Sequence, residues 1–226
     1  LTGLPNRGLL EKRLQTAFAE ARRHDRLLAV LYIDLDGFKP INDRLGHDAG
    51  DNALRQIARR LRNHLPDEDV VARLGGDEFA IYMAGPLSNT ILEGVCRGLL
   101  ERLGQSIPID DRRIAIGASV GLSHSTGKDG LDSSEMLRRA DVAMYVSKRG
   151  GKMRCTWFKD DFDRNLEAIR DMDDELRKAL LNDEFRVNYQ PLVDAKTREV
   201  VAVDCGFAVT VFGADTQVGN QVFTGF

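Results

Sequence analysis

The apolar run Leu27–Ile33 is the sequence feature that most limits how this chain can fold. The run is far shorter than the ~20 residues that a membrane-spanning helix needs, and it ends at Asp34. A short, uninterrupted apolar segment closed by acids indicates a strand that is buried on both faces. The rest of the chain must therefore supply helices that cover both sides of a sheet.

The spacing of apolar residues up to position 158 predicts these helices and further strands. Helices are expected at Arg7–Arg23, from Asp51, from Ser88 to Gly104 and from Ser133 or Ser134, and strands at Asp69–Leu74, Phe79–Met83, Ile114–Leu122 and Met153–Phe158. Gly75 and Gly76 supply the positive φ angles that a hairpin turn between two of the strands needs. A hairpin combined with crossover helices predicts an α/β (α+β) sandwich of the ferredoxin-like kind, with helices flanking a central mixed β-sheet.

The composition excludes several classes of protein. The chain has 226 residues, of which 42% are hydrophobic, and it carries a formal net charge of −3, as is typical of a globular protein. Because no stretch is rich in Lys and Arg, we expect neither a nucleic acid nor an anionic membrane as a partner. Cys96, Cys155 and Cys205 are far apart and follow no pattern, which excludes a disulfide framework and a Cys-based zinc site and favours a reducing cytoplasm.

Changes in composition divide the chain into three parts. Residues 1–158 form the predicted sandwich, and residues 159–183 carry apolar side chains at helical spacing, so we expect a helical connector there. Residues 184–226 form a third part, whose last 28 residues contain no Lys or Arg. The chain begins abruptly at Leu1, and we expect it to be cut from a longer protein.

Four acidic side chains stand where predicted strands end. Asp34 and Asp36 close the buried strand on the same side of it, and Asp77 and Glu78 lie at the tip of the hairpin. If the hairpin lies beside the central strand, the four carboxylates meet at one edge of the sheet and repel one another. A divalent cation would offset this repulsion, and the oxygen ligands suit magnesium, which binds through one or two carboxylates plus substrate phosphates. The alternative is that they are solvated turn residues, since Asp and Gly are common in turns.

The segment Arg73-Leu-Gly-Gly-Asp-Glu-Phe79 resembles the signature of the GGDEF family, the diguanylate cyclases. The opening Leu1-Thr-Gly-Leu-Pro-Asn-Arg7, the segment from Asp34 to Asp51 and the segment from Ala140 to Lys152 resemble other motifs of this family in the same order and spacing. Together the matches cover about residues 1–158. The family's fold is similar to the palm of nucleotidyl cyclases, which agrees with the sandwich predicted from the apolar pattern.

The resemblance implies a reaction and a metal site. The family condenses two GTP molecules into cyclic di-GMP and releases two pyrophosphates. Asp34 and Asp77, together with the backbone carbonyl of Leu35, would hold Mg²⁺ or Mn²⁺. Glu78 would act on the ribose 3′-hydroxyl as a general base or as a second metal ligand. Asp36 is expected to have a structural or supporting role.

The resemblance also implies that Asn42 and Asp51 read the guanine edge. An aspartate can accept hydrogen bonds from guanine N1–H and from the exocyclic amine, and an asparagine offers both a donor and an acceptor. Adenine lacks that pair of donors, so a buried aspartate would stay unpaired beside ATP. The alternatives are that Asp51 is only the N-cap of its helix and that Asn42 is only a turn residue.

The triphosphate is expected to contact three lysines and the hairpin turn. Lys39, Lys148 and Lys152 would hold it as point charges, and Gly75 and Gly76 would admit the α-phosphate beside the turn. The alternative for Lys148 and Lys152, which stand near a helix C-terminus, is that they complement the helix dipole.

The chain departs from the family pattern at two places. Many members carry an inhibitory product site, Arg-x-x-Asp, shortly before the signature; here Asp69 is present, but Pro66 replaces the arginine. Proline cannot supply the bidentate fork that grips a guanine or a phosphate, so we expect product inhibition to be weak. Lys152 stands where the family usually has arginine, which keeps the charge but loses the fork.

A second resemblance begins at Glu184 and is incomplete. The segment Glu184–Asp194 is similar to the opening of an EAL domain, a cyclic di-GMP phosphodiesterase, but Asp204-Cys-Gly206 stands where Glu-Ala-Leu should follow. A barrel of that type needs ~250 residues, so no phosphodiesterase activity is expected of this chain.

The sequence therefore predicts a diguanylate cyclase. The expected partners are GTP, a second copy of the chain as a homodimer that catalysis requires, and a sensor domain upstream in the parent protein. The segment itself is expected in the cytoplasm and without membrane contact, although the parent could be anchored upstream of Leu1. The alternative is a non-catalytic GTP-binding module that regulates a phosphodiesterase; a polymerase-like nucleic-acid enzyme is opposed by the acidic net charge.

Overall fold

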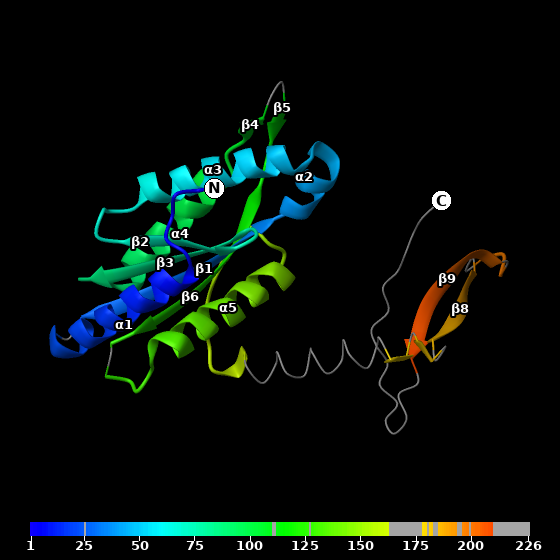
Figure 1. Ribbon diagram of the computed structural model, residues 1–226. Coiled ribbons are helices and arrows are strands. Elements are labelled where there is room, and N and C mark those ends of the chain that lie inside the picture. Colours follow the sequence, from blue (N-terminus) through cyan, green and yellow to red (C-terminus); the bar gives the residue numbers. More distant parts are fainter. Residues whose placement is uncertain are drawn as a thin grey trace. The chain divides into compact units, whose positions relative to one another are not determined.

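The computed structural model describes residues 1–24, 26–109, 112–126, 128–162, 178–179, 181–182, 185–193, 196–198 and 200–209 (Figure 1). The chain divides into two compact units, Leu1–Phe162 and Asp163–Phe226. The first unit contains the predicted acids and the motifs that resemble a known family.

Five strands in the described part of the first unit form one sheet in the order β2-β3-β1-β6-β7. Their bounds are β1 Leu27–Asp36, β2 Val70–Gly75, β3 Glu78–Gly85, β6 Gly117–Ser125 and β7 Cys155–Trp157. Neighbouring strands are antiparallel except β6 and β7, which are parallel. The predicted mixed sheet is therefore confirmed.

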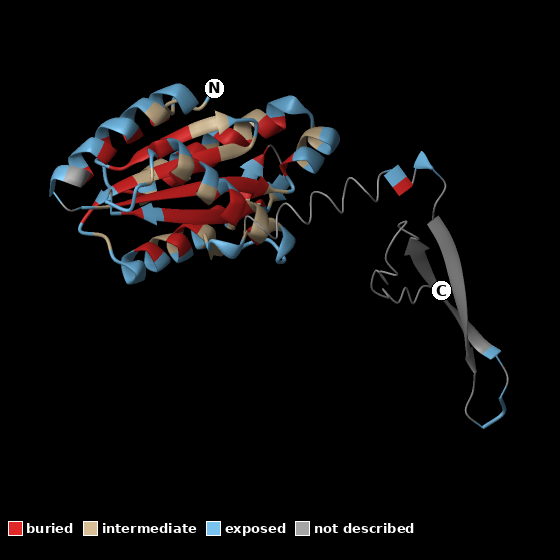
Figure 2. Cartoon of the chain, turned by 90° about the horizontal axis from the view of Figure 1, so that it is seen from below, coloured by how far each residue is buried: buried red, intermediate tan, exposed pale blue. Residues whose placement is uncertain are grey.

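Helices cover both faces of this sheet, as the buried strand requires. One hydrophobic cluster joins the sheet to α1 (Arg7–His24) and α5 (Ser133–Arg149), and the other joins it to α3 (His47–His64) and α4 (Asn89–Leu103). Figure 2 shows the strands as a largely buried band and the outer faces of the helices as mostly exposed. The predicted fold class, an α/β sandwich with flanking helices, is confirmed.

Strand β1 is the central strand, and its side chains alternate between the two clusters. Ile33 packs on the side of α3 and α4, whereas Tyr32 packs on the side of α1 and α5. Because side chains alternate along a strand, Asp34 and Asp36 lie on the same side as Tyr32. The strand reaches Asp36 rather than ending at Ile33, so both aspartates belong to the sheet.

The region between β1 and β2 differs from the prediction, because it contains two helices instead of one. Helix α2 (Phe38–Leu45) was not predicted, and α3 begins at His47 rather than at Asp51. Gly37 and Gly46, with φ of 80° and 83°, bracket α2. With only eight residues, α2 is too short for its apolar periodicity to stand out in the sequence.

Three other boundaries also differ. Ile107–Ile109 (β4) and Arg112–Ile114 (β5) form a separate hairpin, and β6 starts only at Gly117 instead of Ile114. Strand β7 starts at Cys155 rather than at Met153, because the residues before it have left-handed backbone angles. The predicted cap and stop of α4, Ser88 and Gly104, are confirmed; α5 begins at Ser133, but its cap is Asp132.

The second unit contains an antiparallel hairpin of β8 (Phe185–Val193) and β9 (Val200–Val209). Positions 163–177, 180 and 183 of the expected connector, and the tail beyond residue 209, lie outside the described residues. Within the described part of the chain, no helix has the length and the apolar character that crossing a membrane would require.

Candidate active site

The hairpin signature lies directly beside the end of the central strand. Strands β1 and β3 pair with Asp34 opposite Glu78, and the backbone N–H of Leu35 donates to the carbonyl oxygen of Asp77 at 3.3 Å. Residues directly opposite in an antiparallel pair place their side chains on the same face. The condition for the predicted acidic edge is therefore met: the hairpin brings its acids to the end of β1.

Asp34 is a buried carboxylate whose charge is only partly balanced. Its side chain is 8% exposed, and Oδ2 lies 2.5 Å from Nζ of Lys148 on the last turn of α5. Oδ1 is buried and has no hydrogen-bond partner. Burial raises the pKa of Asp34, the Lys148 ammonium lowers it, and the charges of Asp77 and Glu78 raise it further. Lys148 therefore balances only one oxygen of this carboxylate, Oδ2.

Glu78 is oriented by a side chain that sequence reasoning did not identify. The hydroxyl of Tyr32 donates to Oε2 of Glu78 at 3.0 Å, and Nη2 of Arg7 donates to the Tyr32 hydroxyl oxygen at 3.4 Å. Burial, followed by the Glu78 charge, raises the pKa of Tyr32, so the phenol stays protonated and remains a donor. The signals in the sequence were the hydroxyl within the otherwise apolar run and the arginine that ends the opening motif.

The Arg73 side chain fixes the backbone of the hairpin turn. Its Nε and Nη2 atoms donate to the carbonyl oxygen of Gly76 at 3.0 and 2.6 Å. Gly76 has a φ of 49°, as the turn prediction requires, whereas Gly75 has no positive φ and ends β2. A Cβ added at either glycine would meet no atom within 4 Å, so the space above the turn is open to a ligand.

The two residues expected to read guanine lie on neighbouring helices. Asn42 is on α2 and Asp51 is on α3, and both are half-buried. A Cβ added at Gly50 would lie 1.9 Å from Oδ1 of Asn42, so the amide packs against the backbone next to Asp51. The N-cap of α3 is Gly46, which makes the interpretation of Asp51 as an N-cap wrong. Asn42 is likewise a helical residue and not a turn residue.

The three predicted phosphate ligands differ in their surroundings. Lys39 is exposed in the first turn of α2, and Lys152 is exposed in the loop that follows α5. Lys148 is half-buried against the Asp34 carboxylate. The structure therefore places Lys148 on the residue predicted to hold a metal, a contact that the sequence did not predict.

The residues of this edge fit a divalent cation that shares its coordination with substrate. The described residues include no group of three or more His, Cys, Asp or Glu side chains arranged to hold a metal ion by themselves. Magnesium, however, is bound through one or two carboxylates plus phosphates, and it prefers oxygen ligands. Asp34, with its unpaired oxygen, and Asp77 supply such a donor set.

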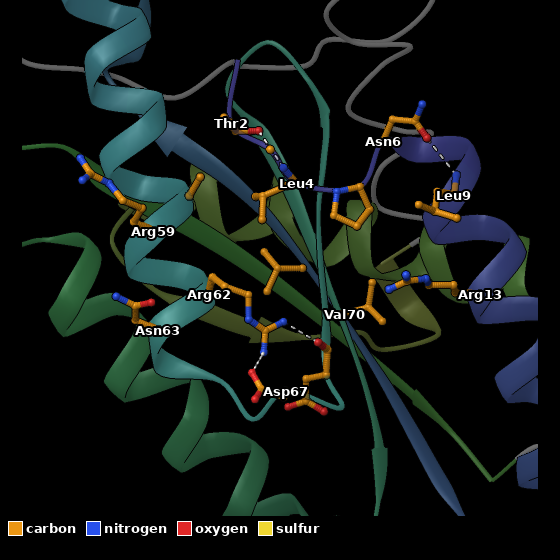
Figure 3. A pocket seen from close by; sticks show the side chains of 15 residues that line it. Thr2, Leu4, Asn6, Leu9, Arg13, Arg59, Arg62, Asn63, Asp67 and Val70 are labelled. Carbon is orange, nitrogen blue, oxygen red and sulfur yellow. Dashed lines mark hydrogen bonds and ion pairs between the residues drawn. The ribbon is translucent and has the colours of Figure 1, made fainter.

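A large hollow lies elsewhere, between the N-terminal segment, α3 and the start of β2 (Figure 3). Next to it, Arg62 donates to the carbonyl oxygens of Leu65 (3.2 Å), Pro66 and Asp69 (2.7 Å), and it lies 3.8 Å from the Asp67 carboxylate. The guanidinium thus closes the loop that contains the incomplete Arg-x-x-Asp pattern.

Comparisons with known proteins agree with this geometry. The family model described as "Diguanylate cyclase, GGDEF domain" matches residues 1–154. The bifunctional diguanylate cyclase/cyclic di-GMP phosphodiesterase MucR of Pseudomonas aeruginosa is 37% identical over 206 residues, which are 90% of this chain and 30% of MucR. Diguanylate cyclase TpbB of the same organism is 42% identical over 154 residues, 66% of this chain and 34% of TpbB. The chain thus spans about a third of the length of these curated relatives.

Solved structures give the same result. The crystal structure of the TpbB GGDEF domain is 38% identical, with a TM-score of 0.67 over 70% of this chain and 99% of that chain. The GGDEF domain of DgcB from Caulobacter crescentus, in complex with c-di-GMP, is 29% identical, with a TM-score of 0.65 over 69% of this chain and 92% of that chain. With its sheet order, its acidic edge and a family match over residues 1–154, this chain belongs to the GGDEF family of diguanylate cyclase domains.

Proposed function

We propose that this chain acts in cyclic di-GMP signalling as a diguanylate cyclase, which condenses two GTP molecules into cyclic di-GMP and releases two pyrophosphates. The observation that carries the proposal is the pairing of Asp34 with Glu78 across β1 and β3, beside an open glycine turn. This pairing puts a carboxylate suited to a metal and a carboxylate suited to a hydroxyl proton at one edge of the sheet. A module that only binds GTP would not need a glutamate at position 78 whose carboxylate is oriented by the Tyr32 hydroxyl.

Asp34, Asp77 and the backbone carbonyl of Leu35 would hold Mg²⁺ or Mn²⁺. A divalent cation at these oxygens would neutralise charge on the transferring phosphoryl group and lower the pKa of a hydroxyl bound to it. Support comes from the buried, unpaired Oδ1 of Asp34. Lys148, which balances Asp34 in this structure, would then be available to a phosphate.

Glu78 is proposed to take the proton from the attacking ribose 3′-hydroxyl. The hydrogen bond from Tyr32 occupies Oε2 and fixes the orientation of the carboxylate. Tyr32 is thus proposed as a positioning residue and Glu78 as the catalytic base.

Separate groups of residues are proposed to bind the base and the phosphates of GTP. Asn42 and Asp51 would pair with guanine, which is supported by the packing of the Asn42 amide against Gly50, next to Asp51. Lys39, Lys148 and Lys152 would contact the triphosphate, and the open turn at Gly75 and Gly76 would admit the α-phosphate.

The reaction is proposed to need a two-fold homodimer, because one unit carries one set of these residues and the product joins two nucleotides. Two-fold symmetry lets each 3′-hydroxyl attack the α-phosphate bound to the other subunit. A sensor domain upstream in the parent protein is proposed to bring the subunits together. The chain is also proposed to act in the cytoplasm, because its cysteines are few and follow no disulfide pattern in the sequence.

The test is to incubate the purified full chain with GTP and Mg²⁺ and to measure cyclic di-GMP and pyrophosphate by chromatography and mass spectrometry. We expect product whose yield per molecule rises with protein concentration, and about a hundredfold less or lower still from Glu78→Gln. A constant yield per molecule from a protein that sediments as a monomer would contradict the dimer mechanism.

A non-catalytic GTP-binding module is the second candidate. It is favoured by relatives whose names give only the opposite activity, such as the cyclic di-GMP phosphodiesterase NbdA of Pseudomonas aeruginosa, which is 35% identical over 200 residues. It is also compatible with a lysine seated on Asp34. Measurable GTP binding without any product would support this candidate over the cyclase.

A further inference from the structure

We propose that Asp36 is a positioning residue that fixes the loop after α5, so that Lys152 is held at the catalytic edge. The loop runs from Gly150 to Arg154, between α5 and β7. The part of the proposal that concerns nucleotide rests on the proposed function, because it takes Lys152 as a ligand of the triphosphate. The part that concerns the loop rests only on the contacts described below.

Both carboxylate oxygens of Asp36 are used by protein donors. Oδ1 accepts from the hydroxyl of Ser119 at 2.9 Å, and Oδ2 accepts from the backbone N–H of Met153 at 3.1 Å. Ser119 lies on β6, so the first contact fixes the carboxylate against the neighbouring strand. The second contact joins the end of β1 to a loop 117 residues further along the chain.

The loop has a conformation that needs such support. Lys152 and Met153 have φ angles of 64° and 47°, which place two consecutive non-glycine residues in the left-handed region. Side chains disfavour this region because Cβ approaches the following carbonyl oxygen, and it persists only where the surroundings enforce it. A free loop of this sequence would relax to other angles and carry the Lys152 ammonium with it.

Contacts from several elements enforce the conformation, and Asp36 supplies the one from the catalytic strand. The N–H of Lys152 donates to the carbonyl oxygen of Ser147 at 3.1 Å, within the C-terminal turn of α5. The thioether of Met153 covers Gly117, where an added Cβ would lie 2.1 Å from Sδ and 3.2 Å from Oδ2 of Asp36. Gly117 pairs with Asp36 across β1 and β6, so backbone, thioether and carboxylate meet at one point.

The contact between Asp36 and Met153 affects where the Lys152 ammonium lies relative to the acids of the site. Asp36 is two residues from Asp34, so the strand that is proposed to hold the metal also fixes the loop that carries Lys152. Loss of the Asp36 carboxylate leaves the Met153 N–H without its acceptor and frees the loop. We expect weaker binding of the triphosphate, with little change in the chemical step, because Lys152 contacts ground state and transition state alike.

The first experiment measures the loop itself. Limited trypsin digestion of the folded full chain, followed by mass spectrometry, reports cleavage after Lys152 and Arg154, and cleavage requires local opening. We expect Asp36→Ala to speed this cleavage about fivefold or more, and Asp36→Asn to stay close to wild type, since an amide oxygen still accepts from Met153. Asp67→Ala, at an exposed aspartate on another loop, is the matched control.

The second experiment measures nucleotide affinity by calorimetry with a GTP analogue that has an α,β-methylene bridge, so that binding is read without turnover. We expect Asp36→Ala to weaken binding about tenfold, the size of one charge-assisted contact, and Asp36→Asn to restore it. Steady-state kinetics should then show a raised KM and a kcat within about threefold of wild type.

A second variant keeps the test decisive if Asp36→Ala does not fold. Gly117→Ala keeps the Asp36 side chain but crowds its Oδ2 at 3.2 Å and pushes the Met153 thioether away, because the new Cβ would lie 2.1 Å from Sδ. We expect it also to speed cleavage and to weaken binding of the analogue. Trp157, the single tryptophan of the chain, lies four residues after Met153 and ends β7. Its fluorescence reports whether β7 is intact.

The outcomes separate this inference from the proposed function. Unchanged cleavage in both Asp36→Ala and Gly117→Ala would overturn the role of Asp36, whether or not the wild type makes cyclic di-GMP. Faster cleavage with unchanged analogue affinity would overturn the link to Lys152. A wild type that binds the analogue but forms no product would refute the cyclase, while the Asp36 variants would still test the loop.

Discussion

Nζ of Lys148 lies 2.5 Å from Oδ2 of the buried Asp34, while Oδ1 of the same carboxylate has no partner. The ammonium comes from the last turn of α5, and the carboxylate comes from the end of the central strand. The protein therefore balances one oxygen of this carboxylate and leaves the other without a hydrogen bond. This contact gives the first prediction.

We expect Lys148→Ala to lower the free energy of unfolding at pH 7 by about 2 kcal/mol, because it leaves the buried Asp34 charge without its partner; the partial exposure of Lys148 keeps the loss below that of a fully buried pair. Added Mn²⁺ should recover more stability in the variant than in the wild type. Urea unfolding with and without the metal measures both effects. Lys39→Ala, which removes an exposed lysine, is the control, and an equal response to Mn²⁺ in all three proteins would contradict the metal site.

Glu78→Gln is expected to lower kcat by about a hundredfold or more, because the amide cannot accept the hydroxyl proton, while leaving the melting temperature nearly unchanged. The stability should persist because the amide oxygen can still accept from Tyr32. Asp77→Ala should abolish turnover as well. Product formation and thermal melts are the measurements.

Tyr32→Phe is the matched control for that experiment, because it keeps the buried ring and removes only the donor. It should lower kcat by roughly tenfold, less than Glu78→Gln, since the base remains but loses its orientation. Full activity in Glu78→Gln, or a larger loss in Tyr32→Phe, would show that the carboxylate is not the base.

Asp51→Ala should weaken the preference for GTP over ATP, because the aspartate accepts from donors that adenine lacks. The preference is measured as the ratio of kcat/KM for the two nucleotides. Gly50→Ala should raise the KM for GTP although it removes neither polar side chain, since the new Cβ would lie 1.9 Å from Oδ1 of Asn42 and displace the amide. Asp48→Ala, in the exposed first turn of α3, is the control. An unchanged preference in Asp51→Ala would remove this residue from the base-reading role.

Added cyclic di-GMP should inhibit the chain weakly, because the Pro66–Asp69 loop itself has no arginine with which to grip it. Pro66 has no cation, and Arg62 is committed to the carbonyl oxygens of Leu65, Pro66 and Asp69. Initial rates measured against added cyclic di-GMP test this expectation. Non-competitive inhibition at low product concentration would contradict it.

The sequence predicted the layers of this fold more completely than it predicted the contacts of the site. The apolar run of β1 and the paired glycines of the hairpin are local signals, so the central strand and its neighbour followed from them. Helix α2 could not be predicted in the same way, because it has only eight residues and is bracketed by glycines. The residues of the site were found by resemblance of motifs, which identifies types and spacing but not contacts.

What the sequence could not supply are the contacts between elements far apart in the chain. The pairing of Lys148 with Asp34 depends on how α5 packs on β1, and the hydrogen bond from Tyr32 to Glu78 depends on the register of β1 and β3. A hydroxyl in an apolar strand and a lysine at a helix end have ordinary local explanations. Only tertiary structure shows that each contacts an acid of the site.

Asp69 gives a prediction about pH. Its side chain lines the hollow beside α3, it is buried at 5% exposure, and Oδ2 has no hydrogen-bond partner. Burial raises the pKa of Asp69 to about 6; the Glu68 charge adds to the rise, and the Arg62 charge opposes it. A folded-state pKa above the ordinary value of 3.8 means that, between about pH 4 and pH 6, the folded protein keeps a proton that the unfolded chain has released.

Raising the pH through that window therefore removes stability from the folded state, by at most about 3 kcal/mol for a shift of this size. Asp69→Asn abolishes this titration, so its stability relative to wild type should be lowest near pH 4 and should rise until about pH 7. Urea unfolding of both proteins at several pH values between 4 and 8 measures the difference. Asp67→Asn, an exposed neighbour on the same loop, should show no such trend. A difference between Asp69→Asn and wild type that stays constant across this range would mean that Asp69 titrates in the folded protein as it does in the unfolded chain.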